Sequence, residues 1–186
     1  MNEKPILFNT EMVRAILDGR KTQTRRPLKP QPASGDIFFY NTERHPRTFA
    51  AMHADYHAPF FKDDELYVRE TWAPLMFAPT MPSGKYVYRA DCRDSDDNLW
   101  PSIMGNRDRV IWHPSIHMPK EAARIWLRVK SVAVQRIPDI SEEEAKAEGV
   151  FPVGSSFKVA FWELWKKLYG YNTKWAWVIE FERVKR

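Results

Sequence analysis

Two segments near the end of the sequence restrict the fold more than any other feature, because both have the pattern of long β-strands. Residues 124–136 are rich in β-branched side chains and end before Pro138, which cannot continue a strand. Residues 175–181 place large apolar side chains on one face. That face carries Trp175, Trp177, Ile179 and Phe181. The chain is therefore expected to be organised around a sheet with one buried face.

The residues between these two strands predict two helices. Ser141 and Glu144 have the spacing of a capping box, and Gly149 is expected to end the helix that begins there. A longer helix is predicted over residues 156–169, with an apolar stripe on one side and Gly170 at its end. No β-α-β rhythm is sustained along the chain. The sequence thus predicts an α+β fold, namely a small, mostly antiparallel β-barrel with peripheral helices and loop insertions.

The length of 186 residues fits a single domain that spans residues 1–186. Between about residues 30 and 60 the periodicity weakens and Pro and Gly punctuate the chain, which predicts a loop insertion carrying one short helical or strand piece. Further short strands are expected at residues 6–8, 65–72, 86–89 and 109–112. Two prolines exclude a regular strand or helix in residues 113–119.

Composition limits the environment and the partners. The net charge of +5 and the pI of about 9.3 favour a polyanionic partner without requiring one. Cys92 is the only cysteine, which excludes an internal disulfide and fits a reducing compartment. The N-terminus lacks the apolar core of a signal peptide, and no apolar run approaches the length of a membrane span. A cytoplasmic protein without a membrane partner or a cofactor is expected, and its oligomeric state is left open.

The densest group of cations lies in residues 19–27. Gly19 is expected to end a helix that begins with Thr10 as its N-cap, and a proline ends the extended segment that follows. The cations are therefore held in a turn and a strand rather than in a free tail. On a regular strand Lys21 and Thr24 lie on opposite faces, so a bulge or a turn is required to bring them together. We expect this stretch to line the functional pocket.

Lys21 and Thr24 form the pair with the clearest chemistry. A threonine hydroxyl is a poor nucleophile unless a base removes its proton. Lys21 is such a base only when neutral, and both burial and the neighbouring arginines lower the pKa of a lysine. These neighbours are Arg20, Arg25 and Arg26. The alternative, in which Lys21 and the arginines only contact phosphate groups or water, stays open.

Two glutamates are candidates for the carboxylate of such a site. Glu148 lies at the end of the short capped helix, directly before Gly149. Glu70 ends a predicted strand, and its alternative is a salt bridge with Arg69 or another arginine. For Glu148 the alternative is an ordinary glutamate on the solvated side of a helix. The sequence alone does not decide between these readings.

Several histidines also carry candidate chemistry. Ser115 and His117 are expected at a pocket rim, although no nucleophile-elbow motif surrounds the serine, and a rigid connector explains the segment equally well. His53 and His57 have the i, i+4 spacing of two zinc ligands on a helix. No cysteine or H-E-x-x-H pattern supports a metal site, so no metal is expected.

The tryptophans divide into two groups. Trp72, Trp112 and Trp126 are candidates for base stacking next to a basic surface. Trp162 or Trp165, and Trp175 or Trp177, lie in predicted apolar stripes, where core packing explains them.

Residues 16–26, Ile-Leu-Asp-Gly-Arg-Lys-Thr-Gln-Thr-Arg-Arg, resemble the signature of the ASCH domain family of the PUA-like superfamily. Residues 68–72, residues 114–119 and the Trp-rich C-terminal strand resemble a larger branch of that family, which is associated with phages and prophages and often labelled morphogenetic. The resemblance implies a small β-barrel with flanking helices, and work on RNA or nucleotides.

Compact proteins similar to this chain are amidohydrolases that remove the acetyl group from N4-acetylcytidine. In them a lysine acts as base, a threonine as nucleophile and a glutamate as proton donor. The resemblance places these roles on Lys21, Thr24 and Glu148. The substrate contacts that we expect come from Arg20, Arg25, Arg26, Glu70, Trp72, Ser115 and His117.

Three functions follow as hypotheses. The first is a hydrolase acting on a modified nucleoside or on RNA, most directly an amidohydrolase for N4-acetylcytidine or a related nucleotide. The second is an RNA-binding module without catalysis, which the basic pI and the aromatic content favour. The third is an assembly protein of a phage particle, which predicts that mass spectrometry detects the chain in purified particles.

Overall fold

The structure is a computed structural model that describes residues 3–32, 39–41, 48–51, 54–74, 86–92, 111–171 and 173–185. Its strands are β1 (Glu3–Leu7), β2 (Gln23–Pro27), β3 (Phe39–Asn41), β4 (Thr48–Ala51), β5 (Ala54–His57), β6 (Glu65–Arg69), β7 (Trp72–Pro74), β8 (Tyr86–Tyr88), β9 (Trp126–Arg136) and β10 (Trp175–Val184). Its α-helices are α1 (Thr10–Leu17), α3 (Glu142–Ala147) and α4 (Phe157–Tyr169). Short 3-10 turns complete the order at η1 (Arg89–Asp91), η3 (Ser115–His117), η4 (Lys120–Ala122) and η5 (Ile137–Asp139).

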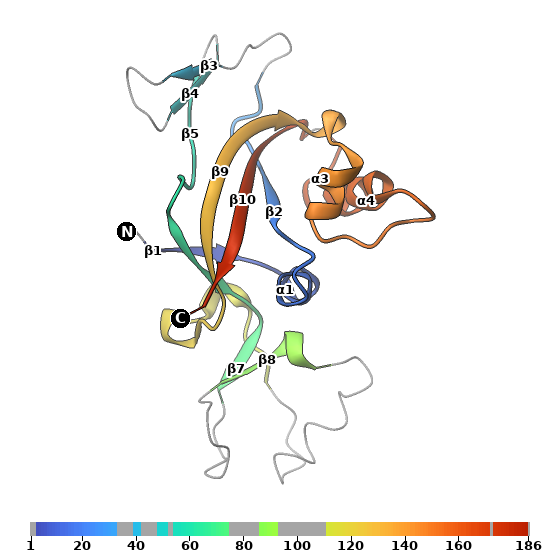
Figure 1. The fold of residues 1–186 in the computed structure, drawn as a ribbon. Coiled ribbons are helices and arrows are strands. Elements are labelled where there is room, and N and C mark those ends of the chain that lie inside the picture. Colours follow the sequence, from blue (N-terminus) through green and yellow to red (C-terminus); the bar gives the residue numbers. More distant parts are fainter. Residues whose placement is uncertain are drawn as a thin grey trace.

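The main sheet has five strands in the order β1-β6-β9-β10-β2. All neighbouring strands pair antiparallel except β1 and β6, which are parallel. Figure 1 shows β9 and β10 as the long, bent centre of the molecule. The fold is therefore α+β with a mostly antiparallel sheet, as predicted. Among the described residues no pairing joins β1 to β2, so the sheet is open along these two edges and a closed barrel is not found.

One face of the sheet packs on α1 to form the main core. Trp177, Ile179 and Phe181 of β10 are buried there, which confirms the face predicted from their alternation. From α1, Val13 and Ile16 pack into the same cluster. This arrangement fixes α1 against the end of β2, where the basic stretch begins.

The N-terminus of α1 differs from the prediction. The N-cap is Asn9 rather than Thr10, because the side chain of Asn9 accepts a hydrogen bond from the backbone N–H of Met12 at 2.8 Å. Thr10 is the first residue inside the helix. Asparagine is at least as good an N-cap as threonine, so composition alone did not separate the two positions.

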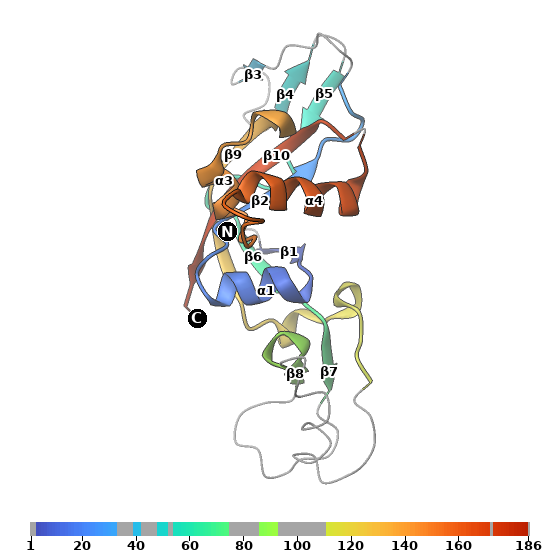
Figure 2. The ribbon, with the colours of Figure 1, turned by 90° about the vertical axis from the view of Figure 1, so that its right-hand side faces the viewer.

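A second, smaller core joins α3 and α4 to the opposite face of β10. Phe161 and Trp165 of α4 pack with Ala145 of α3 and Ala176 of β10. The capping box that starts α3 is present as predicted, with Ser141 as the N-cap. In Figure 1 α3 and α4 lie to the right of β2 and β10, and Figure 2 shows α4 above α1.

The segment predicted as a loop insertion carries more structure than expected. Strands β3, β4 and β5 form a separate antiparallel sheet, where one short piece was predicted. The predicted zinc pair falls partly outside the described residues, because His53 is not among them. The strand expected at residues 109–112 also lies partly outside, and the described Ile111 and Trp112 belong to no strand. No helix in the described part of the chain is long and apolar enough to cross a membrane.

Candidate functional site

The turn after α1 decides where Lys21 lies. Gly19 has a φ of +74°, in the region that favours glycine, and the backbone N–H groups of Arg20 and Lys21 both donate to the carbonyl of Ala15 at 2.9 Å. Lys21 therefore precedes β2 and does not follow its alternation. It forms an isolated antiparallel bridge with Glu148, the C-cap residue of α3. The turn thus brings the basic stretch against the end of α3.

The ammonium group of Lys21 is fully enclosed and fully hydrogen-bonded. Its Nζ donates to the carbonyl of Gln23 at 2.8 Å, to the carbonyl of Glu148 at 2.9 Å and to Oε2 of Glu148 at 2.9 Å. The side chain is 0% exposed, and that of Glu148 is 5% exposed. Three donors therefore meet three acceptors, which is the full capacity of a lysine ammonium.

Glu148 is shared between two cations. Its Oε1 accepts a hydrogen bond from Nη1 of Arg25 at 2.9 Å, while Oε2 is bound by Lys21. The Arg25 guanidinium also donates to Oε1 of Gln23 at 2.6 Å and to Oε1 of Gln135 at 2.5 Å, and Nη2 lies 3.2 Å from Oε1 of Glu144. Its Nε is buried without a hydrogen-bond partner among the described residues. Glu148 is thus not a solvated helix glutamate but the centre of a buried charge network.

Burial and charge act in opposite directions on Lys21. Desolvation, the largest cause, lowers the pKa of Lys21, and the charge of Glu148 opposes this by raising it. The nearby charges of Arg25 and Arg26 lower the pKa further, and the net direction is downward. A buried lysine of this kind is easier to deprotonate than one in water, which a general base requires.

Thr24 lies next to this network with its hydroxyl unbound. The residue is 1% exposed, and within the described part of the chain its side chain makes no hydrogen bond. It lines a narrow slot together with Arg25 and Glu148, of about 10 Å³, which is about the space of one water molecule. The remaining walls come from α1 and α4, namely Met12, Phe161, Leu164, Trp165, Leu168 and Tyr169.

Lys21 does not line this slot, but it borders a wider cavity of about 440 Å³, shared with Thr22, Gln23 and Glu180. Thr24 and Glu148 do not line that cavity. A group that reacts with Thr24 must therefore occupy the slot under α4, and the slot must widen to admit anything larger than water.

Gly149 allows α3 to approach the basic stretch closely. Its φ is +81°, and a Cβ atom built on it would lie 2.7 Å from Cβ of Lys21 and 2.8 Å from Cβ of Ala15. Such distances are shorter than ordinary contacts between side-chain carbons, so a side chain here would push α3 away from Lys21. Gly149 thus has two roles: it ends α3, and it permits the contact between Lys21 and Glu148.

We expect Gly149→Ala to lower the free energy of unfolding by roughly 2–5 kcal/mol, from the positive φ and the overlap together. Gly154→Ala is the matched control, since Gly154 also has a positive φ, of +60°, but nothing lies within 4 Å of its Cβ position. That control is expected to cost only about 1–2 kcal/mol. Urea unfolding followed by circular dichroism measures both values. Equal losses in the two variants would show that the close approach at Gly149 does not matter.

The other two arginines of the stretch lie at the edge of the network. Arg20 donates to the carbonyl of Gly149 at 2.7 Å and pairs with Asp18 at 3.0 Å. Arg26 donates from Nη1 to the hydroxyl of Tyr169 at 3.2 Å, and so ties β2 to the end of α4. Among the three arginines, Arg25 alone lines the slot.

Glu70 belongs to a second buried cluster. It is 1% exposed, and its carboxylate accepts hydrogen bonds from Nε of Arg124 at 2.9 Å and from Nη2 of the same residue at 3.1 Å. Burial raises the pKa of the Glu70 carboxyl, and Arg124 opposes this shift. The Arg124 guanidinium also lies 4.0 Å from the ring centroid of Tyr88, whose pKa burial raises to about 12. Glu70 thus forms an ion pair with an arginine, one of the two alternatives predicted for it.

The other residues predicted to contact the substrate, Trp72, Ser115 and His117, lie near the cluster of Glu70 and Arg124. Trp72 stacks on His113 with ring centroids 5.1 Å apart, and its Nε1 is buried without a partner among the described residues. Ser115 and His117 lie on η3, and His117 is exposed. In the described chain none of Trp72, Ser115 and His117 forms a hydrogen bond or ion pair with Lys21 or Glu148. The structure therefore joins Lys21, Arg25 and Glu148 in one hydrogen-bonded network, and Thr24 lines the slot with Arg25 and Glu148.

Sequence reasoning missed the residues that hold Arg25. Gln23, Gln135 and Glu144 supply oxygens to its guanidinium from β2, β9 and α3. The one available signal was the alternation that places Gln23 and Arg25 on the same face of a strand. Of Trp162 and Trp165, one of which was expected in the core, Trp165 is the buried one and Trp162 is 46% exposed. Within the described residues no group of three or more His, Cys, Asp or Glu side chains is arranged to hold a metal ion.

Comparison with known proteins does not identify a family. No family model matches the chain, and no curated protein matches it. Among solved structures, the crystal structure of protein EF3133 from Enterococcus faecalis V583, described as a DUF984 family model, matches with a TM-score of 0.44 and 12% sequence identity. The match covers 99% of this chain and 76% of that chain. The geometry of the site therefore has to carry the functional argument.

Proposed function

We propose that the chain is an amidohydrolase of ASCH-like type that removes the acyl group from N4-acetylcytidine or a related modified nucleotide. The observation that carries this proposal is the contact of 2.9 Å between Nζ of Lys21 and Oε2 of Glu148, beside a slot lined by Glu148 and the unbound hydroxyl of Thr24. A base, an acid and a nucleophile are thus offered within one buried network. The resemblance of residues 16–26 to the ASCH signature supports the same assignment.

The contact between Lys21 and Glu148 can prepare both the base and the acid. Transfer of one proton along this hydrogen bond converts an ammonium and a carboxylate into an amine and a carboxylic acid. Desolvation lowers the pKa of Lys21 and so favours loss of its proton, whereas the charge of Glu148 raises that pKa. The neutral amine of Lys21 is the form that accepts a proton from Thr24.

In the acylation step, Oγ1 of Thr24 forms a bond to the acetyl carbonyl carbon while its proton passes to Lys21. The carbonyl oxygen gains the electron pair of the broken π bond. When that oxyanion collapses, the bond between the carbonyl carbon and N4 breaks, and N4 takes the proton of the Glu148 carboxyl group. Cytidine leaves, and the acetyl group remains as an ester on Thr24.

In the deacylation step, water adds to the ester carbon and gives one proton to the network. The bond to Oγ1 of Thr24 then breaks, and the threonine oxygen recovers a proton from Lys21. Acetic acid leaves and gives its proton to bulk water, and the starting protonation state is restored. Arg25 stabilises the oxyanion in both steps in this proposal, since among the described residues its Nε is a buried donor without a partner, and the residue lines the slot.

The proposal requires α4 to shift when the substrate binds. The slot of about 10 Å³ holds about one water, whereas a modified base needs far more space. Leu168, one of the α4 residues that line the slot, is 44% exposed, so this side of the slot borders solvent. Movements of a helix of this kind are common steps in substrate binding.

The direct test is incubation of the protein with N4-acetylcytidine, followed by chromatography of the products. We expect equal amounts of cytidine and acetate. Absence of cytidine with both the free nucleoside and an oligonucleotide that contains the modified base would reject the amidohydrolase. The network at Glu148 would then be structural.

The pH dependence gives a separate prediction. The proposed reaction needs one proton on the pair of Lys21 and Glu148, so kcat/KM is expected to fall as pH rises and this proton is lost, along a limb whose midpoint lies below about 10.4, the usual value for lysine. In Lys21→Arg the limb and the activity are both expected to disappear, because a guanidinium keeps its proton. Stopped assays across the alkaline range measure this profile. A rate that does not change with pH, or that survives in Lys21→Arg, would remove Lys21 as the base.

A further inference from the structure

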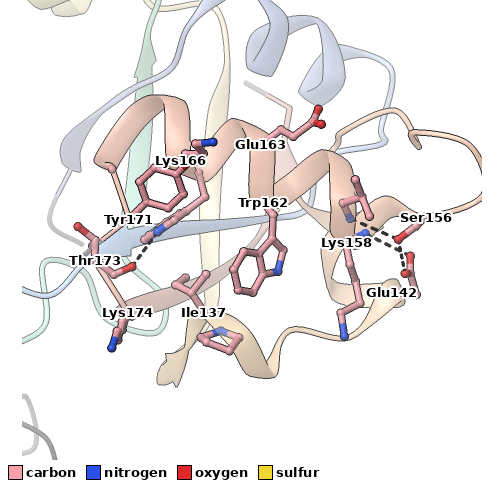
Figure 3. Close-up of a pocket in the computed structure, with 14 residues that line it drawn as sticks. Ile137, Glu142, Ser156, Lys158, Trp162, Glu163, Lys166, Tyr171, Thr173 and Lys174 are labelled. Atoms are coloured by element: carbon pink, nitrogen blue, oxygen red, sulfur yellow. Dashed lines mark hydrogen bonds between the residues drawn. The ribbon is translucent and has the colours of Figure 1, made fainter.

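A groove on the outer side of α4 is separate from the slot and has no role in the proposed reaction. It has a volume of about 820 Å³, which lies within the range of about 300–1,000 Å³ for ligand pockets. It is lined by residues of η5, of α4 and of the turn that leads to β10. Figure 3 shows Trp162 in the middle of this groove, with Lys158 on one side and Tyr171 and Lys174 on the other.

The wall of the groove presents aromatic surface to solvent. Trp162 is 46% exposed and Tyr171 is 75% exposed, and both line the groove. Val159 beside them is 47% exposed. A cluster of exposed large apolar side chains around a hollow is typical of a binding site rather than of a solvated helix face.

The charges around the groove are mainly positive. Lys158, Lys166 and Lys174 line it, and in the described part of the chain none of the three forms an ion pair with a carboxylate. Glu142 also lines the groove and offsets part of this charge, since the charge of Lys158 acts on its carboxylate, which accepts hydrogen bonds from the hydroxyl of Ser156 at 2.7 Å and from the first backbone N–H groups of α4. Glu163 also borders the groove, but Figure 3 shows its carboxylate directed away from Trp162.

The order of these side chains along α4 indicates the kind of ligand that the groove binds. Lys158, Trp162 and Lys166 follow each other at i, i+4 and i+8, so they form one stripe on the helix, in the order cation, aromatic ring, cation. The two lysines are about 12 Å apart along the helix axis. This order matches a nucleic-acid strand, in which phosphates flank a flat base on both sides. A single free anion would require neither the ring nor the second lysine.

We propose that this groove binds a single-stranded nucleic acid, with one base on the indole of Trp162 and the flanking phosphates at Lys158 and Lys166. Aromatic side chains stack on any base, and lysines neutralise phosphates, so the site is expected to bind without strong sequence preference. Trp165 borders both this groove and the slot. The inference concerns binding alone and holds whether or not Thr24 catalyses a reaction.

The test is fluorescence anisotropy with a fluorescein-labelled RNA of ten nucleotides, measured at several salt concentrations. Trp162→Ala is expected to weaken binding by about 5- to 150-fold, the usual loss for one stacked base, with the salt dependence unchanged. The double variant Lys158→Ala/Lys166→Ala is expected to reduce the slope of log K against log salt by about 1.4, because two phosphate contacts are lost. Trp162 and Lys166 are exposed and Lys158 is half-buried, so the fold is expected to remain intact.

Lys167→Ala is the matched control. Lys167 lies on α4 beside Lys166 and is exposed like it, but it does not line the groove. It is expected to leave the slope unchanged. Equal affinity of the RNA for wild type and Trp162→Ala would overturn the proposal. So would binding of free CMP as tight as that of the RNA, or a dimer in size-exclusion chromatography that Trp162→Ala abolishes while RNA binding persists.

Discussion

Replacing Thr24 with alanine is expected to lower kcat for the release of cytidine from N4-acetylcytidine by about 10³-fold or more. The hydroxyl is the only group at this position that can form the acyl-enzyme, and the slot places it beside Arg25 and Glu148. Thr24→Ser keeps a hydroxyl and is expected to retain part of the activity. Chromatographic assays of the three proteins under the same conditions measure the effect.

The structure supplies a sharp control for this substitution. Thr22→Ala removes the same atoms two residues earlier, where the side chain is exposed and does not line the slot. It is expected to leave kcat unchanged. Thr24→Ala itself is expected to cost only about 1 kcal/mol of stability, for a buried methyl group without a hydrogen bond, so loss of folding does not explain loss of activity. Turnover by Thr24→Ala equal to that of the wild type would reject Thr24 as the nucleophile.

Replacing Glu148 with glutamine is expected to lower the free energy of unfolding by about 3–5 kcal/mol. The carboxylate balances two buried cations, Lys21 and Arg25, at 2.9 Å each, and the neutral amide leaves Lys21 without a carboxylate and Arg25 with Glu144 alone. For a chain of this length the melting temperature is then expected to fall by about 6–20 °C. Thermal and urea unfolding followed by circular dichroism measure the loss, and the prediction does not depend on any enzymatic activity.

Glu143→Gln is the control, because Glu143 lies on the same helix and is exposed to solvent. It is expected to change stability by less than about 0.5 kcal/mol. The double variant Lys21→Met/Glu148→Gln is expected to lose less than the sum of its two single variants, since the lysine no longer needs a partner. If the single losses simply add, the pair of Lys21 and Glu148 does not interact energetically, and the network has been misread.

The elements that depend on local pattern were predicted well. The capping box at Ser141, the helix at residues 156–169 and the alternation that buries Ile179 are all present. Each is fixed by neighbours in the sequence, through a cap or a period of side chains. The choice between Thr10 and Asn9 as N-cap failed because both residue types cap helices and lie side by side.

The sequence predicted which residues belong to the site better than it predicted which of them contact one another. The pairing of Lys21 with Glu148 joins residues 127 positions apart, so only the packing of α3 against β2 shows it. Spacing also argued that Lys21 and Thr24 face opposite ways on a regular strand, and the turn at Gly19 keeps Lys21 out of that strand. The role of Arg25 as a second partner of Glu148 had no signal in the sequence.

Trp162 shows the opposite case, in which the sequence held a pattern whose meaning was not recognised. Its spacing with Lys158 and Lys166 is visible in the sequence, yet the apolar stripe of α4 made core packing the simpler explanation. Exposure of 46% for Trp162 against 5% for Trp165 shows that the stripe is split between two faces. Periodicity gives the faces of a helix, but only its neighbours determine which face is covered.

By itself the sequence determined the two long strands, the capped helices and the basic stretch that begins at Gly19, because local spacing and capping act over a few residues. The tertiary structure alone decided that this stretch is buried against Glu148 and that Arg25 shares the same carboxylate. The physical reason is that a buried charge is tolerated only where opposite charge and hydrogen bonds meet it. Those partners come from α3 and β9, which only the folded sheet brings beside β2.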